Sequence, residues 1–305
     1  MTTIETTLDA APRGATPAGF QGRSSGRAVR NQIARIVMWA AFFVAMLPLV
    51  WILGSVLVKG GQLLLQSQWW TYSQRGITAR HVGGGAVHAI QGTLIEALAT
   101  AVIAVPIGIL TAIYLVEYGR GPLARAVSFM VDILTGIPSI VAALFIYALW
   151  VTTFKLDRVA FAVSLALVLL MIPVVVRSTE EMLKLVPNEL REASYALGVP
   201  KWKTISRIVL PTAFSGIITG ILLGLARVMG ETAPLLVLGP YSKSINTDIF
   251  SGFMAALPTM INQDRSEAVD AAVNRVWAAA LTLIVLVMVL NIGGRLIARL
   301  SKVSK

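Results

Sequence analysis

Residues 212–239 read TAFSGIITGILLGLARVMGETAPLLVLG, and this stretch decides the fold. It is apolar along most of its length, and a helix of about 20 apolar residues crosses the hydrocarbon core of a bilayer, where no water satisfies an open backbone. Arg227 and Glu231 are its only charged residues, and their spacing of four places them on one helix face. A charge inside a membrane is costly unless it meets a partner or a water-filled route. The stretch therefore predicts a membrane-spanning helix whose two charges are candidates for function.

Five other stretches have similar length and character, at residues 36–58, 89–116, 126–151, 159–176 and 276–297. Together the six predict an all-α integral membrane protein with six transmembrane helices, in which Pro106, Pro138 and Pro173 kink their helices. The composition agrees, because 56% of the 305 residues are hydrophobic and 13% are charged, against about 25% charged in soluble domains. The chain has no cysteine, which excludes disulfides, thiolate metal sites and thiol nucleophiles.

Basic residues gather on one side of the predicted spans. An even number of spans places both termini on the same side, and with the termini inside, the inner segments hold 17 of the 26 Lys and Arg residues. Because Lys and Arg concentrate in cytoplasmic loops, this bias predicts cytoplasmic N- and C-termini in a multi-pass membrane protein. The gathering of Lys and Arg in cytoplasmic loops of a protein in the lipid bilayer then explains the formal charge of +11, and no nucleic acid is expected as a partner.

These spans set the expected organisation of the chain. Residues 1–35 are expected to form a disordered cytoplasmic tail without a cleavable signal peptide, followed by the first transmembrane helix at 36–58 and an extracytoplasmic loop at 59–88. Residues 89–297 form the transmembrane core, which contains a cytoplasmic loop at 178–211, and residues 298–305 form a cytoplasmic C-terminus. His81 and His88 fall in or near the outer loop and are expected to be solvated, and no metal site is predicted.

The cytoplasmic loop is patterned as two short helices. An N-cap at Asn188 and an apolar stripe that starts at Leu190 predict the first helix. Gly198 is expected to end that helix in the left-handed conformation that glycine adopts at little cost. Pro200 suits the first turn of the second helix, and Pro211 is expected to end it.

This loop resembles that of a known family. Its residues match, with the same spacing, the E-A-A, G and I-x-L-P positions of the coupling loop of ABC importer permeases: Glu192, Ala193, Ser194, Gly198, Ile208, Leu210 and Pro211. Ser194 stands where the pattern has alanine, a small-for-small change. The resemblance implies the ABC type-1 importer permease fold, in which this loop forms coupling helices that dock on a cytoplasmic ATPase and pass its movement to the spans.

The chain contains no G-x-x-x-x-G-K-[ST] phosphate loop. It is therefore expected to be a transport subunit without an ATP site or cofactor of its own, and not an enzyme. ATP and Mg are expected to be bound by a partner ATPase.

The stretch around the two membrane charges carries a second resemblance. Residues 226–236, ARVMGETAPLL, are similar to the A-R-x-x-G-E-T-A-P-L-L signature of phosphate-specific permeases, and matches at 83–93, 117–119, 138–140 and 185–187 extend the likeness to the A-type permease over nearly all of the chain after the tail. The family implies a permease subunit of an ATP-driven inorganic phosphate importer in the bacterial plasma (inner) membrane, where it forms half of the transmembrane pathway. Its expected partners are a homologous C-type phosphate permease, an ABC ATPase dimer and an extracytoplasmic phosphate-binding protein.

The residues of this signature are the candidate substrate pathway. The planar guanidinium of Arg227 suits a tetrahedral oxyanion, so Arg227 is the first candidate for contact. Glu231 has three open roles: holding Arg227 between passages, accepting a proton from hydrogen phosphate, or repelling ions from a closed gate. Gly230 and Pro234 are expected to break the helix around Thr232, so that freed backbone amides face the anion.

Two further sets of residues lie within the predicted spans. Gly216, Gly220 and Gly224 form a stripe of small residues, which predicts a helix-packing face either within this subunit or against a second permease. Glu96 and Asp132 are acidic residues at depth, and each is a possible part of the pathway, although a lone carboxylate of this kind more often bonds a backbone or hydroxyl neighbour.

Three other functions compete with phosphate import. The first is an importer permease for another oxyanion, such as sulfate, molybdate or phosphonate, which residues 227–236 discriminate against. The second is an ion-coupled secondary transporter or channel, in which Glu96, Asp132 and Glu231 relay protons without an ATPase. The third is an integral-membrane enzyme, which is disfavoured because no metal spacing or nucleophile constellation is visible in the sequence.

Overall fold

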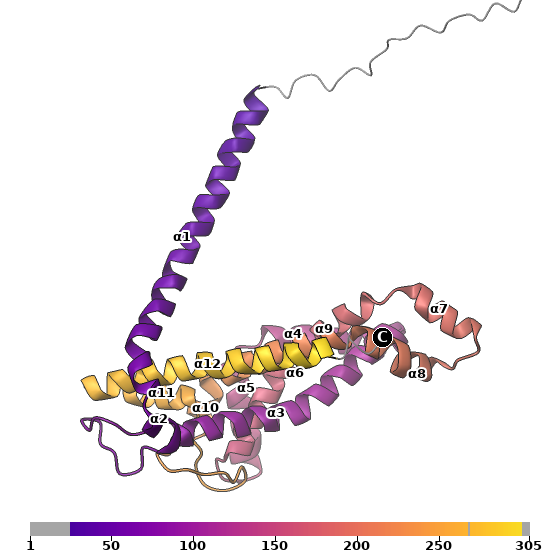
Figure 1. Ribbon diagram of the computed structural model, residues 1–305. Helices are drawn as coiled ribbons and strands as arrows, with labels where there is room; N and C mark the ends of the chain where they lie inside the picture. Colours follow the sequence, from indigo (N-terminus) through magenta and orange to yellow (C-terminus); the bar gives the residue numbers. More distant parts are fainter. Residues whose placement is uncertain (1–24, 268, 301–305) are drawn as a thin grey trace, which may run out of the picture. The chain divides into compact units, whose positions relative to one another are not determined.

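The computed structural model describes residues 25–267 and 269–300, and within them every regular element is helical (Figure 1). Contacts divide the chain into two units, the first of which ends at Gly54 and the second of which begins at Ser55. The elements are α1 (Ser25–Leu64), α2 (Ser67–Thr71), α3 (Val87–Ile113), η1 (Tyr114–Tyr118), α4 (Gly121–Gly136), α5 (Ser139–Ile146), η2 (Tyr147–Thr153), α6 (Ala160–Lys184), α7 (Asn188–Ala196), α8 (Lys201–Thr204), η3 (Ile205–Val209), α9 (Leu210–Met229), α10 (Ala233–Leu238), α11 (Leu257–Arg265) and α12 (Asp270–Leu300). The three η elements are π-helical turns.

The first unit contains the greater part of α1. Residues 25–35 are helical, although they were expected to belong to a disordered tail; the rest of that tail, residues 1–24, lies outside the described residues. The physical reason is that these residues include Ala, Arg and Gln, which favour helix, and adding turns to an existing helix avoids the cost of nucleation. The expected span at 36–58 is thus part of one longer helix, which continues to Leu64.

Five of the described helices are long and apolar enough to cross a membrane, and a bent pair gives a sixth if it is counted as one span. The pair stands where a single span kinked at Pro138 was expected at 126–151, and the bend is sharper than a kink, because α4 and α5–η2 meet at an angle of 107°. Ile137 between them has extended backbone angles, since the residue before a proline, here Pro138, avoids the helical conformation. The other two prolines expected to kink helices lie inside α3 and α6.

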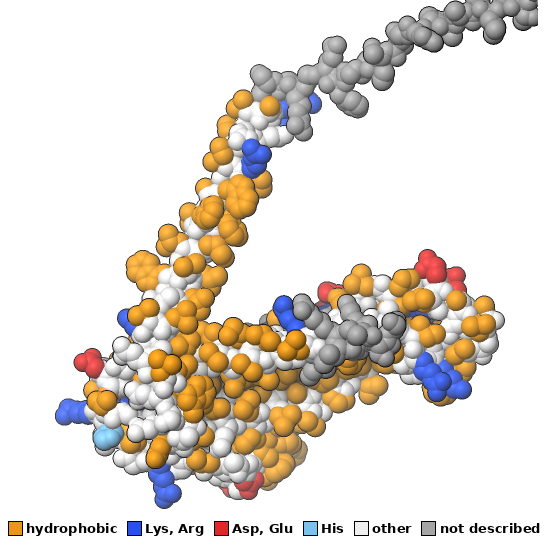
Figure 2. Space-filling model, viewed as in Figure 1, with side chains coloured by type: hydrophobic (Ala, Val, Ile, Leu, Met, Phe, Trp, Pro, Cys, Tyr) orange, Lys and Arg blue, Asp and Glu red, His pale blue; other side chains and the backbone are white. Residues whose placement is uncertain are grey.

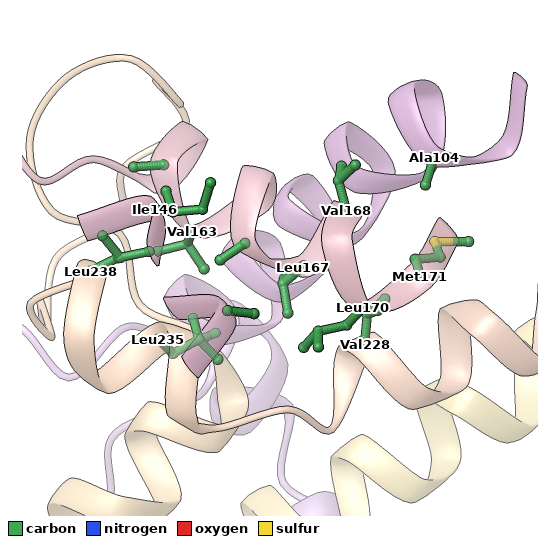
Figure 3. Close-up of a cluster of buried hydrophobic side chains, with 14 of the residues drawn as sticks. Ala104, Ile146, Val163, Leu167, Val168, Leu170, Met171, Val228, Leu235 and Leu238 are labelled. Carbon is green, nitrogen blue, oxygen red and sulfur yellow. The ribbon is translucent and has the colours of Figure 1, made fainter. Parts of the chain in front are cut away.

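The helix α6 is the centre of the second unit. Of its 18 most apolar consecutive residues, 67% are buried, against 22% in the corresponding parts of α3 and α12. A helix that is apolar on all sides must be surrounded by other helices, and α3, α5, α9 and α10 pack around it. Figure 3 shows Leu167 and Leu170 of α6 near Val228 of α9 and Leu235 of α10. This cluster holds the end of α9 and the start of α10 in place.

Glycines allow α9 to approach α6 closely. A Cβ atom on Gly216 would lie 2.1 Å from Sδ of Met182, and one on Gly220 would lie 2.1 Å from Oγ of Ser178. Gly224 faces the same helix. The glycine stripe therefore lies against α6 of the same subunit.

The second unit has two polar ends. In Figure 1, α7 and α8 project at one end, whereas α2, α10 and α11 lie toward the other. Figure 2 shows apolar side chains over much of the visible surface between them, with charged side chains mainly toward the ends. The α6 helix continues to Lys184 and α9 begins at Leu210, so the loop expected at 178–211 is shorter, and it consists mainly of α7, α8 and η3.

Candidate transport pathway and coupling loop

The helix that carries the charged pair is broken next to it. α9 ends at Met229 and α10 begins at Ala233, which confirms the break expected from Gly230 and Pro234. Pro234 lies in the first turn of α10, where its missing N–H leaves no helical bond unmade. The amides of Gly230 and Glu231 donate back to carbonyl oxygens of α9, at 3.1 and 3.2 Å. These two amides are therefore not free for an anion, contrary to expectation, because they close the last turn of the helix.

Arg227 lies in the last turn of α9 and is open to a ligand. Its Nε is 3.7 Å from Oε1 of Glu231, which makes an ion pair but is too long for a hydrogen bond. The side chain of Arg227 is 46% exposed, and that of Glu231 is 18% exposed. Among the described residues, no other side chain forms a salt bridge with this guanidinium. Its two terminal nitrogens can therefore meet an oxyanion without first losing a strong partner.

The two other acidic residues expected at depth have different surroundings. Glu96 is 3% exposed, and it borders a cavity of about 10 Å³ beside the α9–α10 break, so it faces no open route. Asp132 has an exposed side chain and forms an ion pair with Arg177 of α6, which also binds Glu180 at 2.6 Å. Asp132 is thus part of an ion-pair cluster between α4 and α6. It is not a lone carboxylate.

The coupling loop is a helical hairpin with an internal bond. Gly198 has a φ of 74°, the left-handed conformation that its sequence position predicts. The hydroxyl groups of Ser194 and Thr204 are 2.8 Å apart and join α7 to α8. The serine that replaces the expected alanine therefore adds a bond between the two helices. Pro187 occupies the N-cap position of the first helix without a capping side-chain bond, and Asn188, the expected N-cap, is the first helical residue.

Pro211 does not end the second coupling helix, as was expected. One continuous helical stretch runs from Lys201 to Met229. Pro211 lies in the first turn of α9, directly after the π-helical turn η3. Proline lacks the amide that would bond the preceding turn, and the wider π-helical turn removes the clash and the missing bond from a regular helix. The second half of the coupling loop is therefore mechanically continuous with the helix that carries Arg227.

Two basic residues anchor the coupling loop to η1, which continues the C-terminal end of α3. Arg191 of α7 pairs with Glu117 of η1 at 2.9 Å and donates to the carbonyl oxygens of Leu183 and Val186, at 2.9 and 2.6 Å. Lys201 of α8 donates to the carbonyl oxygen of Glu117. Sequence reasoning missed these contacts. The available signal was an acidic residue at the C-terminal end of one span, in a chain whose α7–α8 loop is rich in basic residues.

Comparison with known proteins places these features in a family. The family described as "Binding-protein-dependent transport system inner membrane component" matches residues 104–302. The phosphate transport system permease protein PstA of Mycobacterium leprae is 56% identical over 268 residues, which cover 88% of each chain. PstA 1 of Mycobacterium tuberculosis H37Rv is 52% identical, with 95% of this chain and 94% of that protein covered. PstA of Yersinia pestis is 40% identical, with 90% and 92% covered.

This chain belongs to the PstA family of permeases.

Solved structures agree on the fold of this PstA-family chain. A permease chain of the methionine transporter MetNI in an inward-facing conformation matches with a TM-score of 0.55 at 21% identity, over 70% of this chain and 93% of that one. A chain of a bacterial alginate ABC transporter matches with a TM-score of 0.59 at 16% identity, over 89% and 98%. At these identities the likeness concerns the fold alone, which is that of ABC importer permeases.

The coupling loop of this PstA-family chain leaves large apolar side chains uncovered. Leu197 is 83% exposed, Trp202 is 62% exposed and Leu190 is 41% exposed. Glu192 is exposed on the same helix as Leu190. Apolar side chains that project from a hairpin fixed at its base are suited to insertion into a partner protein.

A buried polar network lies at the end of this PstA-family chain's second unit that is opposite α7 and α8. His88 is 1% exposed, so the expectation that it is solvated was wrong; His81 is exposed. His88 Nε2 is 3.2 Å from the hydroxyl of Tyr241, which donates to Gln74 at 2.8 Å, and Gln74 donates to Asp264 at 3.0 Å. Arg275 pairs with Asp264 at 3.1 Å. Burial raises the pKa of Tyr241, which keeps its hydroxyl a neutral donor. The network joins five parts of the chain: the loop after α2, α3, the segment after α10, α11 and α12.

Proposed function

We propose that this chain is the A-type permease subunit of an ATP-driven importer of inorganic phosphate and forms half of its transmembrane pathway. The PstA relatives carry the name of a phosphate transport system permease, and the fold is that of ABC importer permeases. The proposal assigns to this chain the passage of phosphate and the reception of force from a separate ATPase.

The observation that carries the proposal is the exposed guanidinium at the helix break. Arg227 is half exposed, and its contact to Glu231 is long, so that an arriving phosphate exchanges a weak contact for charge-assisted hydrogen bonds. The irregular backbone at residues 230–232 is tolerated at membrane depth only where it is buried in protein or lines a cavity. Thr232 and Pro234 belong to the same break and would shape the passage.

The coupling loop supports an ATPase as the energy source. Its uncovered apolar side chains offer a docking surface, and the helix that begins at Lys201 continues to Arg227. A push on α8 is thus passed along one helix to the substrate site. An ABC ATPase dimer would bind ATP and Mg at the cytoplasmic face, where Glu192, Ala193, Gly198, Ile208 and Leu210 belong to the contacting loop.

The remaining partners and the orientation follow from the same proposal. Half of the pathway would come from a homologous C-type phosphate permease, and an extracytoplasmic phosphate-binding protein would deliver the substrate. If the bent pair counts as one crossing, six spans would leave both termini on the same side of the membrane. The bias of Lys and Arg supports the cytoplasm as that side, in the inner membrane of a bacterium.

The proposal is tested by Arg227→Gln in the assembled complex, which keeps the length of the side chain and removes its charge. Hydrogen bonds to charged groups contribute about 1.5–3 kcal/mol each, so phosphate uptake should fall by tenfold or more. The measurement is ATP-driven uptake of labelled phosphate in proteoliposomes, with sulfate as competitor.

The control is Arg265→Gln, because Arg265 is exposed and its side chain donates a hydrogen bond to Asn262 of the same helix. This variant should transport phosphate like the wild type. Wild-type uptake by Arg227→Gln would contradict the proposed pathway, and equal competition by sulfate would contradict the proposed substrate.

A further inference from the structure

Glu96 is a buried carboxyl group without a countercharge. It lies on α3 and is 3% exposed, and its Oε1 has no hydrogen-bond partner. The cavity that it borders is lined by uncharged side chains, among them Leu167, Val228 and Leu235. Arg227 and Glu231 belong to the adjacent break but do not line this cavity. No described titratable group therefore faces Glu96 across the cavity from α6, α9 or α10.

The hydroxyl groups near Glu96 do not neutralise it either. Thr93, Thr100 and Ser164 each donate their proton to a backbone carbonyl oxygen, at 2.8, 2.7 and 3.1 Å. The oxygen of Thr93 also accepts the amide of Leu257 at 2.8 Å. Each of these hydroxyls has a single proton, which is already used. A carboxylate at this position would have neither a cation nor a donated hydrogen bond from them.

The end of α9 adds a second reason against a negative charge. Val228 and Met229 border the cavity and form the C-terminal turn of α9. The C-terminal end of a helix carries partial negative charge and carbonyl oxygens without helical partners. It repels a carboxylate and can accept a hydrogen bond from the neutral acid. The cavity of about 10 Å³ is near the smallest size that holds one water molecule.

We propose that Glu96 is a proton-binding site: in this conformation it is a neutral carboxylic acid that donates to a single water molecule beside the α9–α10 break. When the break opens to solvent, the carboxyl group becomes hydrated and releases its proton to water. Closing the break takes the proton up again. No bond other than the O–H bond of the carboxyl group forms or breaks.

This inference rests on the proposed function only where it predicts how phosphate transport depends on pH. If opening and closing of the break accompany phosphate transport, each closure is linked to one proton. A closing equilibrium linked to one proton changes by about tenfold per pH unit above the pKa of the hydrated carboxyl, with closure favoured by acid. Transport should therefore lose activity as the pH rises.

The direct test is infrared difference spectroscopy on the purified complex, in which wild type is compared with Glu96→Gln at neutral pH. Loss of a carbonyl-stretch band of a protonated carboxylic acid in Glu96→Gln is the expected result. Loss of a carboxylate band would overturn the proposal, and so would a wild-type carboxylate band that shifts with sodium, because it would identify a cation site. If Glu96→Gln does not assemble, Glu96→Met provides the same comparison, since a neutral site should accept an uncharged side chain of similar length.

Transport provides the second readout. Glu96→Gln imitates the protonated state, so its phosphate uptake should fall less with rising pH than uptake by the wild type. At the limit of one linked proton, the ratio of variant to wild-type uptake rises by about tenfold per pH unit. Glu181→Gln, an exposed glutamate of α6, is the control and should keep the wild-type pH profile. Equal profiles for wild type and Glu96→Gln would overturn the link to transport. A complex that transports no phosphate would contradict the proposed function, whereas the infrared result would stand.

Discussion

At the scale of single residues, the pair formed by Arg191 and Glu117 shows how the coupling loop is fixed to the spans. Their side chains are 12% and 5% exposed, so each needs the other as countercharge. Removing one partner of a buried ion pair costs about 3–5 kcal/mol. Glu117→Gln should therefore lower the melting temperature of the complex and reduce phosphate-stimulated ATP hydrolysis, measured on the same preparation.

The exposed Glu189 of α7 offers the matched control. Glu189→Gln also removes one carboxylate charge, but it leaves the ion pair between Arg191 and Glu117 intact, so both measurements should stay near the wild type. The double variant Glu117→Gln with Arg191→Met should recover part of the lost stability, because no uncompensated charge is then buried. Equal melting temperatures for the two glutamine variants would show that the pair does not hold the loop.

Single residues were predictable from the sequence where their role is local. The conformation of Gly198 needed only its place at the end of a helix, and the pairing of Arg227 with Glu231 needed only their spacing of four. The burial of His88 was not predictable, because its partner Tyr241 is 153 residues away. The enclosure of Glu96 likewise depends on residues from four separate segments. No pattern of neighbouring residues in the sequence predicts such packing.

At the scale of elements, the turn between α7 and α8 determines whether the hairpin is stiff. Gly198 has a φ of 74°, and a Cβ atom there would meet nothing within 4 Å, so a substitution acts through the backbone alone. The left-handed conformation costs an L-residue about 1–2 kcal/mol, and β-branched residues suffer most. Gly198→Val should lower the amount of phosphate transported per ATP hydrolysed, with the spans still assembled.

Asparagine adopts the left-handed conformation more readily than other non-glycine residues. Gly198→Asn should therefore retain more coupling than Gly198→Val, and this order is measured as phosphate uptake divided by ATP hydrolysis in proteoliposomes. The same ratio in both variants and in the wild type would show that this turn is not needed to pass force from the ATPase to the spans.

Element boundaries were predictable where Gly and Pro act by their ordinary chemistry. Lost helical hydrogen bonds explain the break between α9 and α10 at Gly230 and Pro234. They also explain the interruption between α4 and α5 at Pro138. Pro211 was misjudged because a π-helical turn before it absorbs the defect, and the residues of η3 carry no signal for that turn. The same proline can thus end a helix or continue it, depending on the turn that precedes it.

At the scale of the whole molecule, the number of spans depends on the bent pair α4 and α5–η2. Ser128 of α4 bonds Arg177 of α6 at 3.0 Å, and Trp150 of η2 packs on Phe161 of α6 with ring centroids 5.6 Å apart. These two α6 residues are about 24 Å apart along the helix at 1.5 Å per residue. The pair therefore follows α6 over most of a bilayer core despite its bend of 107°. Counting it as one crossing is the arrangement that this packing supports.

The absence of cysteine makes that count directly testable. Arg120 and Lys155 are exposed at the two ends of the bent pair, so Arg120→Cys and Lys155→Cys place single thiols there. We expect a membrane-impermeant thiol reagent added outside intact cells to label the cysteine at 155 and not the one at 120, with Arg75→Cys as the outer reference. If the pair is instead a re-entrant loop, both positions lie on one side and give the same labelling. The span count then becomes odd and the two termini lie on opposite sides, which would place the coupling loop and the N-terminus in different compartments and contradict the proposed orientation.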